Sequence, residues 1–231
     1  MGTKRIVSVG LAVLLLLSLA ALFFSVSTSP HLMIVEWSIE HSGSRITLYQ
    51  ISSEDNSNIT DVFKLLPFHW YATAEYYINP KNKYGFSTDA VVSAITAAVN
   101  TWDSQTSAAV FSYKGTTSRS AGKRDGYNVI DWGPYRAGVI AVTYIWYVGD
   151  MIIETDTRMN TYYKWSLSGE AKKMDVQNIM THEFGHWCGL DDLYDAECYW
   201  LTMYGYADYG ETYKRTLGLG DILGLKCIYG E

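Results

Sequence analysis

The sequence predicts a mixed domain, α+β or α/β, with one sheet and a few helices. The chain has 231 residues, of which 48% are hydrophobic and 18% are charged. It can therefore bury a sizeable core as one domain, and its composition excludes a disordered chain. From about Trp70 onward, the residue patterns follow the order strand, helix, several strands, helix, loop, helix. That order indicates one sheet covered by few helices.

Composition also limits the function. The formal net charge is -6, with 18 basic and 24 acidic side chains, which argues against a nucleic-acid-binding protein because such proteins show a basic face. The chain contains 19 tyrosines and 8 tryptophans. These amphipathic rings suit an extracellular protein with large binding surfaces.

The N-terminus has the features of an export segment. Lys4 and Arg5 precede an uncharged apolar stretch from Ile6 to Phe24. We interpret residues 1–27 as a signal peptide or, because the apolar stretch is nearly long enough to span a bilayer, as an N-terminal membrane anchor. Under both interpretations the rest of the chain lies outside the cytoplasm, because the basic residues favour the inside. The protein is then either secreted or membrane-anchored, and its only membrane contact would be this segment.

The first predicted strand and helix follow a weakly patterned region. Tyr71 to Ile78 is rich in tyrosine and isoleucine and ends at Asn79-Pro80, which predicts a strand and a turn. Ser87 then offers a helix N-cap. The next apolar residues recur with the spacing of one buried helix face; they are Val91, Ile95, Ala98, Val99 and Trp102.

The remaining elements are assigned from the same patterns. Four further strands are predicted, over Val110 to Tyr113, Tyr127 to Trp132, Gly138 to Tyr147 and Met151 to Thr157. Two more helices are predicted, over about Asp175 to Cys188 and Leu219 to Tyr229.

One predicted helix contains a pattern typical of metal chemistry. His182 and His186 are four residues apart and lie on one helix face, so both imidazoles can bind one ion. Glu183 lies one position further round and can contact a metal-bound water. Gly189 can end the helix in a left-handed conformation, which would let Asp192 return as a third ligand. Three protein ligands leave the open position of a catalytic zinc site.

The length of this pattern decides how specific it is. H-E-x-x-H alone also occurs in ordinary helices, but the extended form H-E-x-x-H-x-x-G-x-x-D is much more specific. Asp191 competes with Asp192 for the ligand role, and the spacing favours Asp192.

The segment from His182 to Asp192 resembles the zinc signature of the metzincin peptidases, in the variant whose third ligand is Asp. The stretch from His186 to Tyr194 is similar to the snapalysin-type proteases. Other parts resemble the matrixin-like branch: Ala94 to Trp102, Ile152 to Asp156 with Asn160 and Trp165, and Leu217 to Gly230. The resemblance covers about residues 68 to 230.

This resemblance implies the α+β form of the fold, a metzincin-like catalytic domain. It would have a twisted mixed sheet of about five strands, an active-site helix, a Met-containing turn beneath the metal and a C-terminal helix. Met203 is placed to be the methionine of that turn, and Gly205 stands where some metzincins have a tyrosine. Residues 68–231 would form the catalytic domain, and residues 28–67 an N-terminal segment that is a candidate pro-region.

The resemblance implies two metal cofactors, and the positions of the cysteines bear on how the activity could be kept latent. Zinc is the catalytic ion. Structural calcium is also implied, with Asp150, Glu154 and Asp156 as its candidate ligands. Matrixins are often kept latent by a cysteine in the pro-segment, but all three cysteines of this chain lie within or after the zinc helix.

The three cysteines allow one disulfide bond, as suits an exported protein. Cys198 and Cys227 flank the Met turn and the last helix, so a bond between them would fix that helix to the floor of the site. A bond between Cys188 and Cys198 is the alternative.

The sequence therefore predicts a monomeric, extracytoplasmic zinc endopeptidase that acts on protein or peptide substrates and binds no nucleic acid. A metal-activated water would hydrolyse the peptide bond, with Glu183 as general base. An exposed strand within Gly138 to Tyr147 would bind the extended substrate as an added strand. The alternatives are a catalytically silent, zinc-stabilised binding or adhesion module, and an anchored structural protein whose His-Glu-His pattern is accidental.

Overall fold

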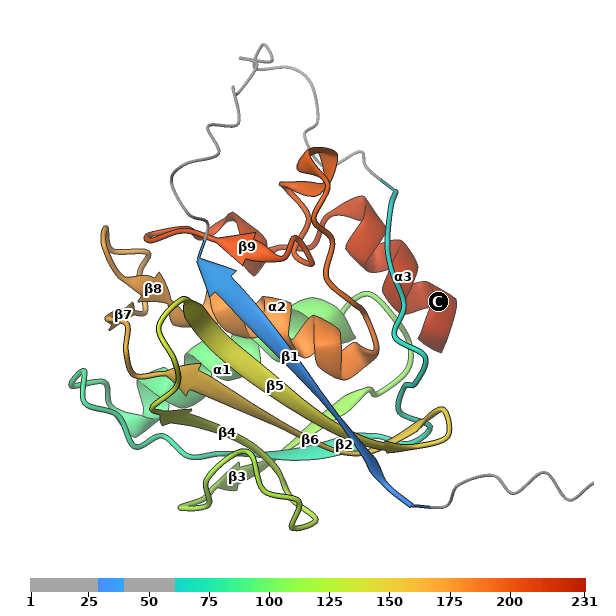
Figure 1. Cartoon of the computed structure of the whole chain (residues 1–231), viewed down its shortest axis with the longest axis horizontal. Helices are drawn as coiled ribbons and strands as arrows, with labels where there is room; N and C mark the ends of the chain where they lie inside the picture. The colour runs from blue at the N-terminus through green and yellow to red at the C-terminus, as the bar shows by residue number, and fades with distance from the viewer. Residues whose placement is uncertain (1–28, 40–60) are drawn as a thin grey trace, which may run out of the picture.

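The computed structural model describes residues 29–39 and 61–231. The predicted signal peptide or anchor at residues 1–27 lies outside these ranges. Within them the chain forms an α+β domain with one main sheet and three α-helices (Figure 1). In the part of the chain that is described, no helix is both long enough and apolar enough to cross a membrane.

The main sheet has seven strands in the order β3-β2-β4-β6-β5-β1-β9. The strand bounds are β1 His31–Ile39, β2 Ala74–Ile78, β3 Phe111–Thr116, β4 Asn128–Gly133, β5 Val139–Val148, β6 Met151–Asn160 and β9 Tyr206–Ala207. Strand β2 pairs in parallel with β3 and β4, and β4 pairs in parallel with β6. Strand β5 is antiparallel to both β6 and β1, so the sheet is mixed. A separate small sheet pairs β7 (Trp165–Ser166) with β8 (Met174–Asp175).

Helices α1 (Thr88–Asp103) and α2 (Val176–Cys188) pack beside each other and against the sheet (Figure 1). The Ser87 side chain caps α1 by accepting from the backbone N–H of Ala90. All five apolar residues predicted for the buried face of α1 are buried. The Trp102 indole N–H donates to the Thr181 carbonyl oxygen at 2.7 Å, which fixes α1 against α2. Helix α3 (Leu219–Tyr229) follows at the C-terminus.

The five predicted strands are confirmed as β2 to β6; β1 and β9 are additional strands of the main sheet, and β7 and β8 form the additional small sheet. Strand β1 escapes a pattern search because both of its faces are apolar: Leu32 and Ile34 are 49% and 46% exposed, whereas Val35 and Trp37 are buried. Strand β9 has two residues and is too short to carry a pattern.

The predicted free edge within residues 138–147 is wrong for this chain. Strand β5 lies between β6 and β1, so β1 covers the edge that was expected to receive a substrate. The segment after residue 60 also joins the domain, because the Leu66 backbone N–H donates to the Gly189 carbonyl oxygen at 2.8 Å. The region interpreted as a candidate pro-region therefore contributes to the folded unit.

The predicted disulfide bond is absent, because Cys188, Cys198 and Cys227 are all free thiols. Cys188 and Cys198 are buried, whereas Cys227 is exposed. The geometry of α3 explains why Cys227 is exposed. The buried positions of α3 are Gly220, Asp221, Gly224 and Leu225, and Cys227 lies off that stripe.

Candidate metal centre and active site

Helix α2 carries the candidate site and ends at a residue that must be glycine. Its N-cap, Asp175, accepts a hydrogen bond from the Asn178 backbone N–H at 3.0 Å. At the other end, Gly189 has a φ of 97°, and a Cβ there would lie 2.9 Å from the Phe68 carbonyl oxygen. Only glycine fits both the left-handed conformation and this close approach. The bend directs the chain back toward the helix.

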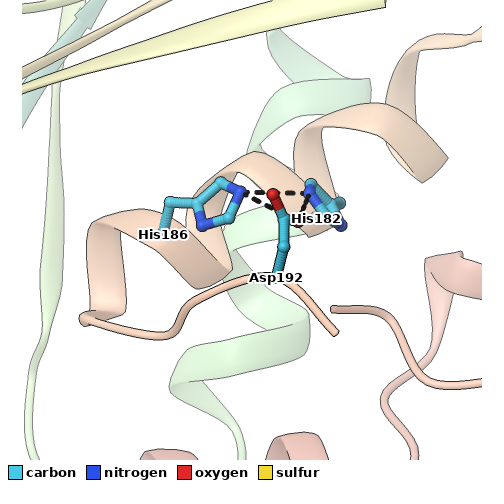
Figure 2. A group of neighbouring side chains, drawn as sticks. All are labelled: His182, His186 and Asp192. Atoms are coloured by element: carbon cyan, nitrogen blue, oxygen red, sulfur yellow. Dashed lines mark hydrogen bonds and ion pairs between the residues drawn. The ribbon is translucent and has the colours of Figure 1, made fainter. Parts of the chain in front are cut away.

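The bend brings Asp192 to the two histidines (Figure 2). The Nε2 atoms of His182 and His186 are 3.1 Å apart, and Asp192 Oδ1 lies 3.2 Å from the first and 3.6 Å from the second. All three side chains are buried. The competing candidate, Asp191, instead pairs with Lys64 at 2.6 Å.

The hydrogen bonds of the histidines show that this cluster suits a cation. The Nδ1 atoms of His182 and His186 lie 2.7 and 2.8 Å from the carbonyl oxygens of Thr202 and Leu190. Because a carbonyl only accepts, each Nδ1 must carry the proton, and each Nε2 presents a lone pair. Asp192 Oδ1 is buried without a hydrogen-bond partner.

Three acceptor atoms therefore face one another with no proton between them. Ligand atoms in a tetrahedral zinc site with bonds of about 2.0–2.1 Å are roughly 3.3 Å apart, which matches these separations. Among the described residues, His182, His186 and Asp192 form the group of His, Cys, Asp and Glu side chains that could hold a metal ion.

The pKa shifts keep these groups in the forms that bind metals. Burial lowers the pKa of His182 to about 4, so its ring is neutral at pH 7. Burial alone would raise the pKa of Asp192, but the His186 and His182 rings and the Tyr194 hydroxyl outweigh it, so that this pKa lies below its ordinary value. A neutral imidazole and an ionised carboxylate are the required ligand forms.

Glu183 lies next to this cluster with its two oxygens in different environments. The Thr143 hydroxyl donates to Oε2 at 2.5 Å, whereas Oε1 is buried without a hydrogen-bond partner. Burial raises the pKa of Glu183 to about 7, against the lowering effect of the Thr143 hydrogen bond. A carboxylate with a pKa near neutrality suits a general base.

A buried chain of hydrogen bonds that the sequence did not predict orients Glu183. The Trp187 indole N–H donates to Thr157 Oγ1 at 2.9 Å, and the Thr157 and Thr143 hydroxyls are 2.6 Å apart. Because an indole only donates and a carboxylate only accepts, the bonds run from Trp187 through Thr157 and Thr143 to Glu183. Alternation in β5 and β6 could have shown that the two threonines face inward, but not that they meet.

Met203 lies beneath the helix turn that carries the histidines. A Cβ on Gly185 would lie 2.1 Å from Met203 Sδ, so the methionine packs directly on the glycine between His182 and His186. The Asp221 carboxylate of α3 accepts from the backbone N–H groups of Thr202 and Met203 at 2.7 and 3.1 Å. Helix α3 thus fixes the turn whose Thr202 carbonyl orients His182.

Tyr194 is a further site residue that the sequence analysis missed. Its hydroxyl donates to Asp192 Oδ2 at 3.1 Å. Its ring occupies the space beside Gly205, where a Cβ would lie 2.3 Å from Tyr194 Cε1. The departure at Gly205 was the available signal, because a missing side chain leaves room for another ring.

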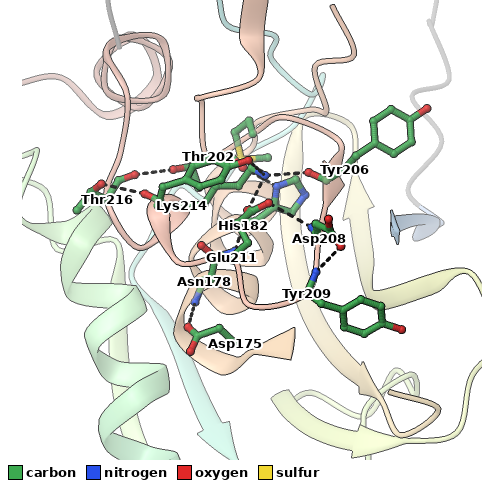
Figure 3. A network of polar contacts seen from close by, with 12 residues as sticks. Asp175, Asn178, His182, Thr202, Tyr206, Asp208, Tyr209, Glu211, Lys214 and Thr216 are labelled. Atoms are coloured by element: carbon green, nitrogen blue, oxygen red, sulfur yellow. Dashed lines mark hydrogen bonds and ion pairs between the residues drawn. The ribbon is translucent and has the colours of Figure 1, made fainter. Parts of the chain in front are cut away.

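The buried Lys214 stabilises the loop beside His182 (Figure 3). Lys214 Nζ donates to the Tyr206 carbonyl oxygen at 2.8 Å and to Glu211 Oε1 at 2.7 Å. The same Glu211 oxygen accepts from Asn178 Nδ2 at 3.0 Å, which ties this loop to α2. The ammonium group also lies 5.4 Å from the Trp37 ring centroid.

The predicted calcium ligands are not brought together as a metal-binding group in the described ranges. Glu154 accepts from the backbone N–H groups of Asp125 and Gly126, both at 2.7 Å. Asp156 accepts from three backbone N–H groups in residues 122–129. Asp150 accepts from the Tyr71 hydroxyl at 2.7 Å. These acids satisfy loop backbone and surface donors.

Comparison with known proteins agrees with the geometry of the site. No curated protein matches the sequence. The family model described as matrixin matches residues 69–230, which include β2 to β6, β9 and all three helices. The chain therefore belongs to the matrixin family of metallopeptidases.

Proposed function

We propose that this chain is an extracytoplasmic zinc endopeptidase that hydrolyses peptide bonds in protein or peptide substrates. Membership of the matrixin family supports zinc metallopeptidase activity in general. The observation that carries the proposal for this chain is the convergence of His182 Nε2, His186 Nε2 and Asp192 Oδ1 beside Glu183. The extracytoplasmic location is supported by the basic and apolar residues at positions 1–27.

The proposed roles follow from the atoms that are free in the site. His182, His186 and Asp192 would hold the zinc ion, and Met203 would pack beneath them. A bound zinc ion supplies a polarised scissile carbonyl and a lower pKa for the attacking water. Glu183 Oε1 accepts the proton of that water, while Thr143 holds Oε2. Glu183 then delivers the proton to the leaving amine.

Metal content and hydrolysis test this proposal together. The purified full chain should bind one equivalent of zinc and hydrolyse a quenched fluorescent peptide library. Glu183→Gln should keep the zinc and lose about 10²- to 10⁴-fold in rate, the range that a general base contributes. A chelator should abolish hydrolysis, and added zinc should restore it.

The result also separates the alternatives. Stoichiometric zinc with no hydrolysis by any form of the chain would favour the silent binding module. A chain without zinc would make the His-Glu-His pattern accidental.

A further inference from the structure

Strand β1 occupies the edge of the sheet beside the candidate active site. It pairs antiparallel with β5 in a register that runs from His31 opposite Tyr147 to Ser38 opposite Val139. Its end also pairs in parallel with β9, through Ser38 and Ile39. Strand β1 precedes the part of the chain that the matrixin model matches, which begins at residue 69.

The end of β1 reaches the proposed zinc ligands. The Trp37 indole stacks on the His182 imidazole, with ring centroids 3.8 Å apart and planes 7° apart. Trp37 is fully buried. The register of β1 with β5 shifts between Trp37 and Ser38, and such bulges redirect side chains. No substrate side chain can contact this face of His182 while Trp37 is there.

Two features of β1 weaken its docking, its single paired edge and an unpaired indole N–H. Along residues 31–37 it is paired on one edge only, and Leu32 and Ile34 are exposed. The Trp37 indole N–H is buried without a hydrogen-bond partner, which costs about 1–3 kcal/mol. Two contacts of Glu36 act in the opposite direction and stabilise the docked strand. They are an ion pair with Arg136 and a hydrogen bond from the Tyr135 hydroxyl.

We propose that β1 is an autoinhibitory strand that occupies the position of an extended peptide substrate, so that the intact chain acts only in the fraction of molecules from which β1 has left the sheet. A sheet edge accepts one neighbouring strand at a time. A substrate that pairs with β5 must therefore displace residues 31–39. This inference rests on the proposed function, because it describes how the same site is regulated.

The test uses a chain in which β1 keeps its native sequence. A recognition site for a specific protease is inserted between Ile39 and Asp61, and the zinc-loaded protein is compared before and after cutting. Cutting makes the docking of β1 bimolecular, so that dilution releases it. If more than about 90% of the uncut chain is docked, the apparent KM should fall about tenfold or more on cutting and dilution, with little change in kcat.

Peptides and point variants test whether the contact between Trp37 and His182 is responsible for the inhibition. A synthetic peptide of residues 31–39 should inhibit the diluted, cut enzyme competitively, and the same peptide with Trp37→Ala should inhibit less. In the uncut chain, Trp37→Ala should lower the apparent KM. Ile34→Ala is the matched control on the exposed face of the same strand, and it should leave the apparent KM unchanged.

Amide hydrogen exchange gives a measurement that does not need activity. The β5 amides should exchange faster after cutting and dilution, and the 31–39 peptide should restore their protection. Equal KM values before and after cutting, with no inhibition by the peptide, would overturn latency and leave the proposed function intact. A cut chain that exposes β5 and binds zinc but hydrolyses nothing would instead refute the proposed function.

Discussion

Thr143 Oγ1 and Glu183 Oε2 are 2.5 Å apart, and both side chains are fully buried. The other carboxylate oxygen, Oε1, has no hydrogen-bond partner. The threonine therefore occupies one oxygen of Glu183 and leaves the other available to accept a proton. It connects β5 with α2, the helix that carries the histidines.

Thr143→Val removes this hydroxyl without changing the size of the side chain. A hydrogen bond to a charged group contributes about 1.5–3 kcal/mol, so kcat should fall roughly 10- to 100-fold while KM and zinc content stay nearly constant. Steady-state kinetics and metal analysis measure these quantities. Thr143→Ser should recover most of the rate. A large rise in KM would mean that Thr143 contacts the substrate.

Tyr194→Phe should weaken zinc binding, because the Tyr194 hydroxyl orients Asp192. Loss of such an outer partner typically costs about 10–100-fold in metal affinity. Competition with a chromophoric chelator measures this affinity. Tyr162→Phe, at a tyrosine that is 66% exposed, is the control. If Tyr194→Phe binds zinc with unchanged affinity, the bend at Gly189 positions Asp192 without help from the tyrosine.

Gly185→Ala should destabilise the domain. The added Cβ would lie 2.1 Å from Met203 Sδ and 2.9 Å from Trp102 Cζ2. Overpacking of this kind costs about 1–3 kcal/mol, and thermal unfolding should show it. Adding Met203→Ala to Gly185→Ala should recover part of the loss, because it removes the nearer atom. If Gly185→Ala unfolds at the same temperature as the parent protein, the turn that contains Met203 moves aside at little cost in free energy.

Asp103 makes the stability of the domain depend on pH. Burial raises the pKa of Asp103 to about 6, against backbone hydrogen bonds from Phe111 and Val110. Its pKa in the unfolded chain is about 3.9, so its contribution to stability is complete below that value and is lost as pH rises through about 6. Asp103→Asn should therefore gain stability relative to the parent between pH 4 and 7.

Urea unfolding of both proteins across this range measures the difference in their free energies of unfolding. The difference isolates Asp103, because every other titrating group is common to the two proteins. A difference that stays constant with pH would contradict the assigned cause.

The patterned parts of the fold were predictable from the sequence. The buried face of α1 repeats with the helical period, and the five residues predicted for it are all buried. Three ligand candidates were also predictable, because their positions depend on one helix and one glycine bend. Local spacing determines both features.

The remaining features depend on contacts between distant parts of the chain. Tyr194 reaches Asp192 only because Gly205 leaves space for its ring. The pairing of Thr143 with Thr157 depends on the register between β5 and β6. The position of β1 depends on the stacking of Trp37 on His182, and these residues are 145 positions apart in the sequence. No local pattern encodes such pairings.

The place of β1 in the sheet has a consequence for the activated enzyme. Once β1 leaves, β5 presents a row of unpaired backbone groups, and a bare strand edge of this kind can pair with another chain. We therefore expect the active form to self-associate at high protein concentration and to last longest when it is dilute or saturated with substrate. While it is docked, β1 covers this edge of β5 and so also protects the protein from edge-to-edge aggregation.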